Sequence, residues 1–272
     1  MTIREDSADV KLGLCLETVF PETPIEERMP KVASLGFSHV ECWLVDRVIS
    51  DPEVLARAAE RSGLCITNLV IDGPDGGISG GLTDPRHRPQ WLARAEDVMD
   101  YARRAGIGKA IVCTGNVVEN LSDDQMRQSV LDGLKATVDI AERTGVTLLL
   151  ESLNTLYDHP GYWLTGSDLG AELCREVGSP RLRLLFDCYH MQIMEGDLLR
   201  HIERNIDVIG HFHAAGVPGR HEVFLSEIDY PYVLSRISSM SYEGVFGLEY
   251  MPSLESSASL QKTLEHLIRK PA

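Results

Sequence analysis

Four residues that can bind a metal ion or transfer protons stand at the ends of separate apolar runs. These are Glu151 after "TLLL", Asp187 after "LRLLF", His213 in "IGHFHAAG" and Glu249 after "VFGL". Three carboxylates that met without a cation would repel one another and force protonation, so their convergence with an imidazole predicts a metal site. A mainly oxygen donor set favours Mn²⁺, with Mg²⁺ or Co²⁺ as alternatives.

Each of these residues also has a simpler explanation when taken alone. An acid that closes a strand is often the N-cap of the next helix or a solvated side chain. A histidine there is often a satisfied core residue. The recurrence at four successive apolar runs favours the metal site. His211 competes with His213 for the ligand role, because a period of two places both on the same strand face.

The elements that would position these residues alternate along the whole chain. Segments of helical period separate short apolar runs at residues 11–17, 39–43, 64–70, 109–115, 146–151, 183–187, 208–213 and 245–250. Parallel strands need helical crossovers and read as continuous apolar runs when both faces are buried. Eight such units predict an α/β fold, a (β/α)8 TIM barrel. A doubly wound open sheet is the alternative, but no glycine-rich fingerprint follows the first strand.

A closed barrel explains how residues remote in sequence can meet. The ends of consecutive strands are neighbours around one rim, where barrel enzymes build their sites. The sequence has no linker or low-complexity tract that would divide it, which predicts a single domain over residues 1–272. Residues 1–9 are polar and are expected to form a loose N-terminal leader.

Composition restricts the class of partner. The net charge is -15, with 26 Lys and Arg against 41 Asp and Glu. Binding to nucleic acid or to anionic lipid depends on clustered basic residues, so a small-molecule substrate is expected and neither nucleic acid nor membrane. No apolar run approaches the roughly 18–20 residues of a membrane span, and six scattered cysteines without a C-x-x-C pair suggest buried free thiols. A cytoplasmic protein is expected.

Several motifs carry a family resemblance. The segments "LLLESLN", "FDCYHMQ", "GHFHAAGVPGRHE" and "GLEYMP" resemble those of the xylose isomerase-like TIM barrel superfamily, and within it the hydroxypyruvate isomerase family. His213, and His190 three residues after Asp187, resemble a ketose 3-epimerase-like metal site. The resemblance implies a metal-dependent isomerase that interconverts aldose and ketose forms through an enediolate, and it implies a dimer or tetramer. Glu151 and Glu249 would be the acid/base pair as well as metal ligands.

Four further residues are candidates for substrate binding. Arg220 and Glu222 lie in the "PGRHE" loop, which is of the isomerase type. The planar fork of Arg220 suits a carboxylate. His190 can hold a substrate hydroxyl or a developing oxyanion, or it can orient Asp187. Trp43 can form an apolar wall against the substrate.

Other functions remain open on the same residues. Return of the proton to the same carbon would make the chain a ketose 3-epimerase of the tagatose/psicose type, and related keto-sugar lyases or dehydratases use the same proton abstraction. A non-catalytic metal- or sugar-binding barrel subunit of a complex is a further alternative. A metal-dependent abasic-site endonuclease would need a basic groove, which the acidic balance opposes.

Overall fold

The computed structural model describes residues 10–268, so the expected leader at residues 1–9 lies outside the described residues. Nine short β-strands lie at the predicted apolar runs. They are β1 (Lys11–Leu14), β2 (His39–Val40), β3 (Cys65–Ile66), β4 (Asn68–Val70), β5 (Lys109–Val112), β6 (Thr147–Glu151), β7 (Leu182–Asp187), β8 (Ile209–Ala214) and β9 (Val245–Leu248). β3 and β4 together occupy the single run predicted at residues 64–70.

The strands form a closed parallel barrel. Seven of them make one sheet in the order β1-β9-β8-β7-β6-β5-β4, and β2 pairs with β3. Backbone hydrogen bonds join the two sheets on one side, from Glu41 N to Leu14 O and from Leu16 N to Glu41 O, both 2.9 Å. On the other side Cys42 N donates to Asn68 O at 3.1 Å. The predicted TIM barrel is confirmed, and these bonds exclude an open sheet.

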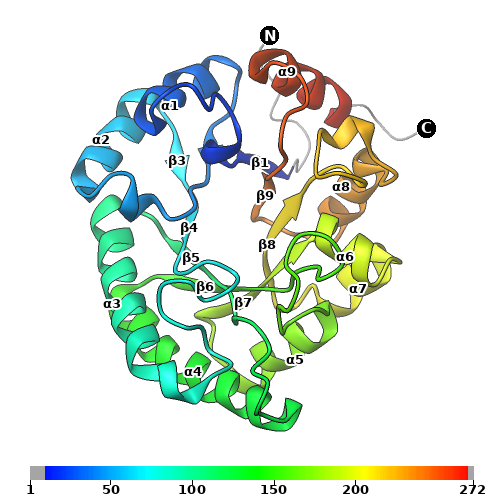
Figure 1. The fold of residues 1–272 in the computed structure, drawn as a ribbon. Helices are drawn as coiled ribbons and strands as arrows, with labels where there is room; N and C mark the ends of the chain where they lie inside the picture. Colours follow the sequence, from blue (N-terminus) through cyan, green and yellow to red (C-terminus); the bar gives the residue numbers. More distant parts are fainter. Residues whose placement is uncertain (1–9, 269–272) are drawn as a thin grey trace.

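Helices surround the strands as an outer ring in Figure 1. Four of them, α2, α3, α4 and α5, end at a glycine in the left-handed conformation, the helix stop that the sequence indicates. The helices are α1 (Ile25–Ser34), α2 (Pro52–Ser62), α3 (Arg88–Ala105), α4 (Asp123–Thr144), α5 (Ser167–Val177), α6 (Cys188–Met194), α7 (Leu198–Asn205), α8 (Tyr230–Ser239) and α9 (Ser256–Leu267).

Helix α6 is an element that the sequence pattern did not predict. It has seven residues and begins directly after β7, with Asp187 as its N-cap. A helix of two turns is too short to show a clear 3.6-residue period, and its start coincides with the end of an apolar strand. Asp187, the predicted metal ligand at the end of β7, is therefore also the N-cap of a helix.

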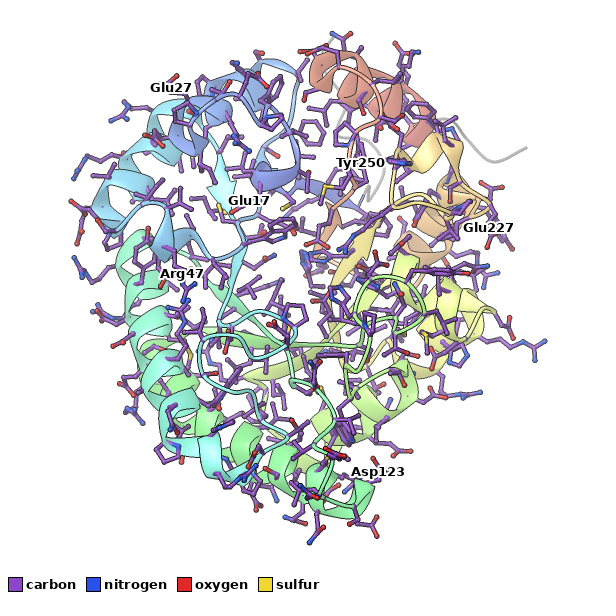
Figure 2. All side chains as sticks on the ribbon, in the orientation of Figure 1. Glu17, Glu27, Arg47, Asp123, Glu227 and Tyr250 are labelled. Atoms are coloured by element: carbon purple, nitrogen blue, oxygen red, sulfur yellow. The ribbon has the colours of Figure 1, made fainter. Side chains whose placement is uncertain are left out.

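Figure 2 shows all side chains of the described residues on the ribbon. Glu27 and Asp123 lie at the periphery, whereas Glu17 lies nearer the strands. All six cysteines are free; five are buried as expected, and Cys65 is exposed. Within residues 10–268, no helix is long and apolar enough to cross a membrane.

Candidate metal centre

The ends of four neighbouring strands bring the predicted ligands together. Glu151 closes β6, Asp187 closes β7, His213 lies in β8 and Glu249 follows β9. Each offers one ligand atom, and these four atoms lie within 4.8 Å of one another. All four side chains are buried. Because β6, β7, β8 and β9 are successive neighbours in the sheet, the barrel itself produces this convergence.

His213 faces the three acids with one nitrogen only. Its Nδ1 lies 3.5 Å from Glu151 Oε1 and 3.5 Å from Glu249 Oε2. Its Nε2 lies 2.8 Å from Glu41 Oε2, on the opposite side of the ring. His211 does not face the acids; its Nε2 lies 2.8 Å from Glu41 Oε1. The geometry therefore puts His213, and not His211, in the cluster.

Glu249 is held through both carboxylate oxygens. Trp43 Nε1 donates to Oε1 at 2.6 Å, and Arg220 Nη2 donates to Oε2. The Arg220 guanidinium also lies over the Tyr189 ring, 5.5 Å from its centroid. Trp43 thus contacts a proposed acid/base residue through its N–H, a contact that the expectation of an apolar wall did not include.

Asp187 uses one oxygen for structure and keeps the other for the cluster. Oδ1 accepts from the backbone N–H groups of Tyr189 and His190 at 2.7 and 3.2 Å. Oδ2 lies 3.6 Å from His190 Nε2. These hydrogen bonds cap α6 and fix the carboxylate while one oxygen still faces its neighbours.

His190 reaches the cluster with a defined tautomer. Asn154 donates to His190 Nδ1 from its backbone N at 3.2 Å and from Nδ2 at 2.7 Å. A nitrogen that accepts a backbone N–H carries no proton, so the proton of neutral His190 is on Nε2. Burial lowers the pKa of His190 well below its usual value, which keeps the ring neutral. Within residues 10–268, Nε2 has no hydrogen-bond partner, so it is a free donor beside Asp187.

Glu222, the fourth predicted substrate-binding residue, bonds to the loop after β9. Its oxygens accept from Ser253 N at 2.9 Å, Ser253 Oγ at 2.7 Å and Leu254 N at 3.0 Å. The side chain is fully buried. The carboxylate therefore accepts hydrogen bonds from the loop after β9, and the expected substrate contact of Glu222 stays a prediction.

The acids of the cluster differ in their electrostatics. Burial raises the pKa of Asp187 to about 7 and also raises the pKa of Glu151. Burial alone would raise the pKa of Glu249 too, but the charges of Arg220 and His213 outweigh it and lower that pKa. The pKa of His213 is raised well above its usual value, since Glu249 and Glu41 outweigh burial. Glu249 is thus the acid of the cluster that ionises most readily, whereas Glu151 binds its proton more strongly.

The donor set fits a divalent cation. Three buried carboxylates converge, and the unprotonated form of His213 Nδ1 would offer a lone pair toward them. Within residues 10–268, Nδ1 has no hydrogen-bond partner, so a buried polar atom is left for a ligand. Three oxygens and one nitrogen suit Mn²⁺, Mg²⁺ or Co²⁺.

Two contributions to this site were not visible as partnerships in the sequence. The carboxylate of Glu41 contacts both histidines of β8. Asp158 accepts from Asn154 Nδ2 at 2.5 Å and from Tyr189 Oη at 2.8 Å. An acid inside the apolar run "HVECW" was the available signal for Glu41. The sequence does not indicate which groups Asp158 contacts.

Comparison with known proteins identifies the family of the chain. The family described as xylose isomerase-like TIM barrel matches residues 29–270. The chain belongs to the xylose isomerase-like TIM barrel family. A 2-oxo-tetronate isomerase of Cupriavidus necator is 39% identical over 249 residues, covering 90% of this chain and 94% of that protein. The hydroxypyruvate isomerase of Escherichia coli is 28% identical over 246 residues, covering 90% and 95%.

Two solved structures superpose on 94% of the chain. A protein from Brucella melitensis described as an AP endonuclease of family 2 has a TM-score of 0.85 at 28% identity, covering 94% of this chain and 98% of that one. D-psicose 3-epimerase from Clostridium cellulolyticum H10 has a TM-score of 0.78 at 18% identity, with the same coverage. At 18% identity, the similarity to D-psicose 3-epimerase supports the fold alone. Taken with the sequence relatives, the family indicates an enzyme of the isomerase or epimerase type that acts on small molecules.

Proposed function

We propose that this chain is a divalent-metal-dependent isomerase of a short 2-oxo acid that carries a hydroxyl group on the neighbouring carbon. The observation that carries the proposal is the meeting of Glu151, Asp187, His213 and Glu249 at one rim of the barrel. The similarity to a 2-oxo-tetronate isomerase and a hydroxypyruvate isomerase supports the substrate class. Mn²⁺ is the proposed ion, because the donors are mainly oxygen with one imidazole.

The two glutamates carry the proton transfers in this proposal. Glu249, whose pKa is lowered, starts ionised and takes the C–H proton from the carbon that bears the hydroxyl group. The electron pair moves into the new double bond between the two carbons, and the former carbonyl oxygen becomes negative. Glu151, whose pKa is raised, gives a proton to the former carbonyl carbon. The hydroxyl proton ends on the other oxygen, so no atom or electron is lost.

A bound divalent cation would supply electrostatic stabilisation of the negative charge that develops on the substrate oxygens. His190 adds a hydrogen bond from its neutral Nε2–H, which faces the cluster and has no other partner within residues 10–268. A preorganised donor at a buried position stabilises a developing oxyanion by roughly 2.7–4 kcal/mol in the best-studied cases. His190 is therefore proposed to hold the oxygen of the substrate.

Arg220 is proposed to bind the carboxylate of the oxo acid. Its Nη2 is engaged by Glu249, and its Nε is buried without a hydrogen-bond partner within residues 10–268. The guanidinium remains charged, because nearby acids raise its pKa further. A planar guanidinium suits a carboxylate better than it suits a neutral hydroxyl group, so Arg220 favours acids over free sugars.

Proton exchange in heavy water tests the proposal directly. Protein loaded with Mn²⁺ is incubated in D₂O with 2-oxo-tetronate or hydroxypyruvate. The Mn²⁺ is then removed from the mixture with a chelator, and the products are examined by NMR. We expect deuterium at the carbon next to the carbonyl group and formation of the positional isomer. If no hydroxy-keto acid and no free ketose exchanges its proton, the proposed isomerase activity is excluded, and a non-catalytic binding subunit is favoured.

Epimerisation is the second candidate, because His213 in the cluster is of the ketose 3-epimerase type. Two acids around one site can also return the proton to the same carbon from the opposite side. The same experiment separates the two: an epimerase would convert tagatose or psicose to its C3 epimer and would leave 2-oxo acids unchanged. Cleavage or loss of water would indicate a lyase or dehydratase instead.

A further inference from the structure

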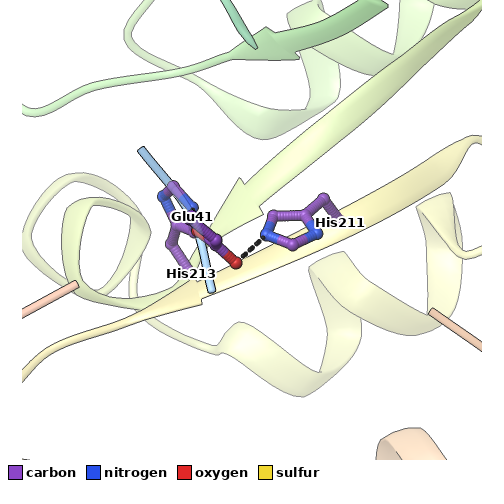
Figure 3. A group of neighbouring side chains, drawn as sticks. All are labelled: Glu41, His211 and His213. Carbon is purple, nitrogen blue, oxygen red and sulfur yellow. Dashed lines mark hydrogen bonds and ion pairs between the residues drawn. The ribbon is translucent and has the colours of Figure 1, made fainter. Parts of the chain in front are cut away.

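A second buried group lies directly behind the candidate metal centre. Figure 3 shows Glu41 with the imidazole rings of His211 and His213. Glu41 Oε1 lies 2.8 Å from His211 Nε2, and Oε2 lies 2.8 Å from His213 Nε2. The three residues are at most 2% exposed. The mechanism proposed above assigns no role to Glu41.

The charge of Glu41 determines what the two rings can do. An ionised carboxylate only accepts hydrogen bonds, so each imidazole must present a protonated Nε2 to it. Each oxygen of Glu41 lies 2.8 Å from one of the two Nε2 atoms, so the carboxylate can accept one hydrogen bond from each ring. When Nε2 of His213 carries a proton, the lone pair of a neutral ring is on Nδ1, the nitrogen that faces Glu151 and Glu249.

The barrel is shaped around this carboxylate. Gly13 in β1 pairs with Gly247 in β9, and Gly247 also pairs with His213 in β8, so the three residues lie at one level. A Cβ atom at Gly247 would lie 2.3 Å from Glu41 Oε1, and one at Gly13 would lie 2.9 Å from the same atom. Any larger residue at either position would collide with Glu41. Two glycines on adjacent strands therefore make the space that the carboxylate fills.

We propose that Glu41 is a positioning residue that holds His213 by its Nε2–H, so that Nδ1 is turned toward the cation bound by Glu151, Asp187 and Glu249. The inference rests on the proposed function, because it concerns the same metal centre. His211 holds the other oxygen of Glu41 and prevents the carboxylate from rotating away. A carboxylate that orients a metal-binding histidine in this way is worth roughly 10–100-fold in metal affinity.

The group is not proposed as a second metal site, although its three residues offer ligand atoms within 4.8 Å of one another. Both oxygens of Glu41 already have an imidazole nitrogen at hydrogen-bond distance. His213 is shared by both groups, and its Nε2 is occupied by Glu41. The proposal therefore requires one divalent ion per chain.

The test replaces the carboxylate by an amide of the same shape. Glu41→Gln removes the negative charge and places an N–H₂ group against one of the two rings. Free Mn²⁺ is measured by electron paramagnetic resonance during titration of the wild type and the variant. We expect one ion per chain in both, with an affinity about 10–100-fold weaker in E41Q. Asp72→Asn is the matched control, since Asp72 is a buried acid bonded only to its own loop in the described contacts.

A second measurement does not depend on the variant being folded. In the wild-type protein loaded with diamagnetic Zn²⁺, ¹⁵N NMR of the histidines should show His213 protonated at Nε2 and metal-bound at Nδ1. The reverse arrangement would overturn the proposal, and so would two ions per chain or an E41Q affinity within about two-fold of the wild type, well short of the expected loss. If the wild type binds no divalent ion, the proposed function falls, and the positioning role falls with it. If the wild type binds the ion and E41Q binds it equally well, only the positioning role of Glu41 is excluded, and the proposed function stands.

Discussion

Glu151 and Glu249 are the same residue type in one cluster, yet their surroundings move their pKa values in opposite directions. Burial raises the pKa of Glu151, whereas the positive charges of Arg220 and His213 lower the pKa of Glu249, which also accepts a hydrogen bond from Trp43. Two acids whose surroundings separate their proton affinities can act as an acid and a base at one pH. The proposed direction of the first proton transfer rests on this difference.

Substitution of the two glutamates should therefore give two different phenotypes. Both Glu249→Gln and Glu151→Gln should lower turnover by roughly 10²–10⁴-fold, the usual contribution of a general acid or base. With a 2-oxo acid in D₂O, E151Q should still exchange the C–H proton next to the hydroxyl group, and E249Q should not. Metal content measured after dialysis controls for loss of the ion. Equal exchange in both variants would contradict the assigned order.

The buried Asp187 should make the metal-free protein sensitive to pH. Its pKa is raised from 3.8 to about 7, so between these values the unfolded chain has released a proton that the folded chain keeps. The free energy of unfolding should then fall as the pH rises from about 4 to about 7, and stay low above that. Asp187→Asn removes the titration, and its side-chain oxygen can still cap α6. Urea unfolding with chelator present, near pH 5 and near pH 8, should show a smaller loss in D187N. Parallel losses in the two proteins would count against the raised pKa.

Sequence alone was enough to find residues that end strands, and it was not enough to find their partners. Glu151, Asp187 and Glu249 could be predicted to meet, because barrel closure makes the ends of successive strands neighbours whatever their sequence separation. The contact between Glu41 and His213 joins residues 172 positions apart, and no periodic pattern relates them. The buried role of Glu222 was equally hidden, since a loop carboxylate carries the same signal whether it binds substrate or backbone.

At the level of elements, the loop between β6 and α5 and the short helix α6 act together. The loop supplies Asn154, and α6 supplies His190 and Tyr189. Asp158 ties the two by accepting from Asn154 Nδ2 and Tyr189 Oη. The eight long helical stretches and eight strand runs were predictable from their periods, whereas α6 was not, because seven residues give too little periodicity. The unpredicted helix is the one that carries a candidate substrate residue.

Changes at Asn154 should alter activity through His190. Asn154→Ala keeps the backbone donor to His190 Nδ1 and loses the side-chain donor. Asn154→Asp also keeps this backbone donor, but it puts a carboxylate there that favours a proton on His190 Nδ1 and so competes with the Nε2–H tautomer. We expect turnover to fall in the order wild type, N154A, N154D, with a total loss of roughly 10–100-fold. Steady-state kinetics measure this order, and Leu156→Ala, an exposed residue of the same loop, is the control. Equal activity of N154A and N154D would contradict the tautomer argument.

At the scale of the molecule, the cation would join half of the barrel wall. Its ligands come from β6, β7, β8 and β9, whose ends otherwise bring three buried carboxylates together. An ion that binds the folded chain and not the unfolded chain stabilises it by about 2.7 kcal/mol at 100 times its dissociation constant. In a protein of this size that corresponds to a rise in melting temperature of about 5–10 °C.

Removal of the ion should therefore lower the melting temperature, and a ligand variant should abolish the difference. In a thermal scan at fixed protein concentration, chelator should lower the midpoint of the Mn²⁺-loaded wild type by about 5–10 °C. His213→Ala removes the imidazole that faces the acids, so its midpoint should respond little to chelator or to added Mn²⁺. Leu156→Ala should respond as the wild type does, because the Leu156 side chain is exposed and is not one of the four predicted ligands. If chelator does not change the melting temperature of the wild type, a bound ion does not stabilise the four strand ends, and the hydrogen bonds of Glu41, Trp43 and Arg220 hold them instead.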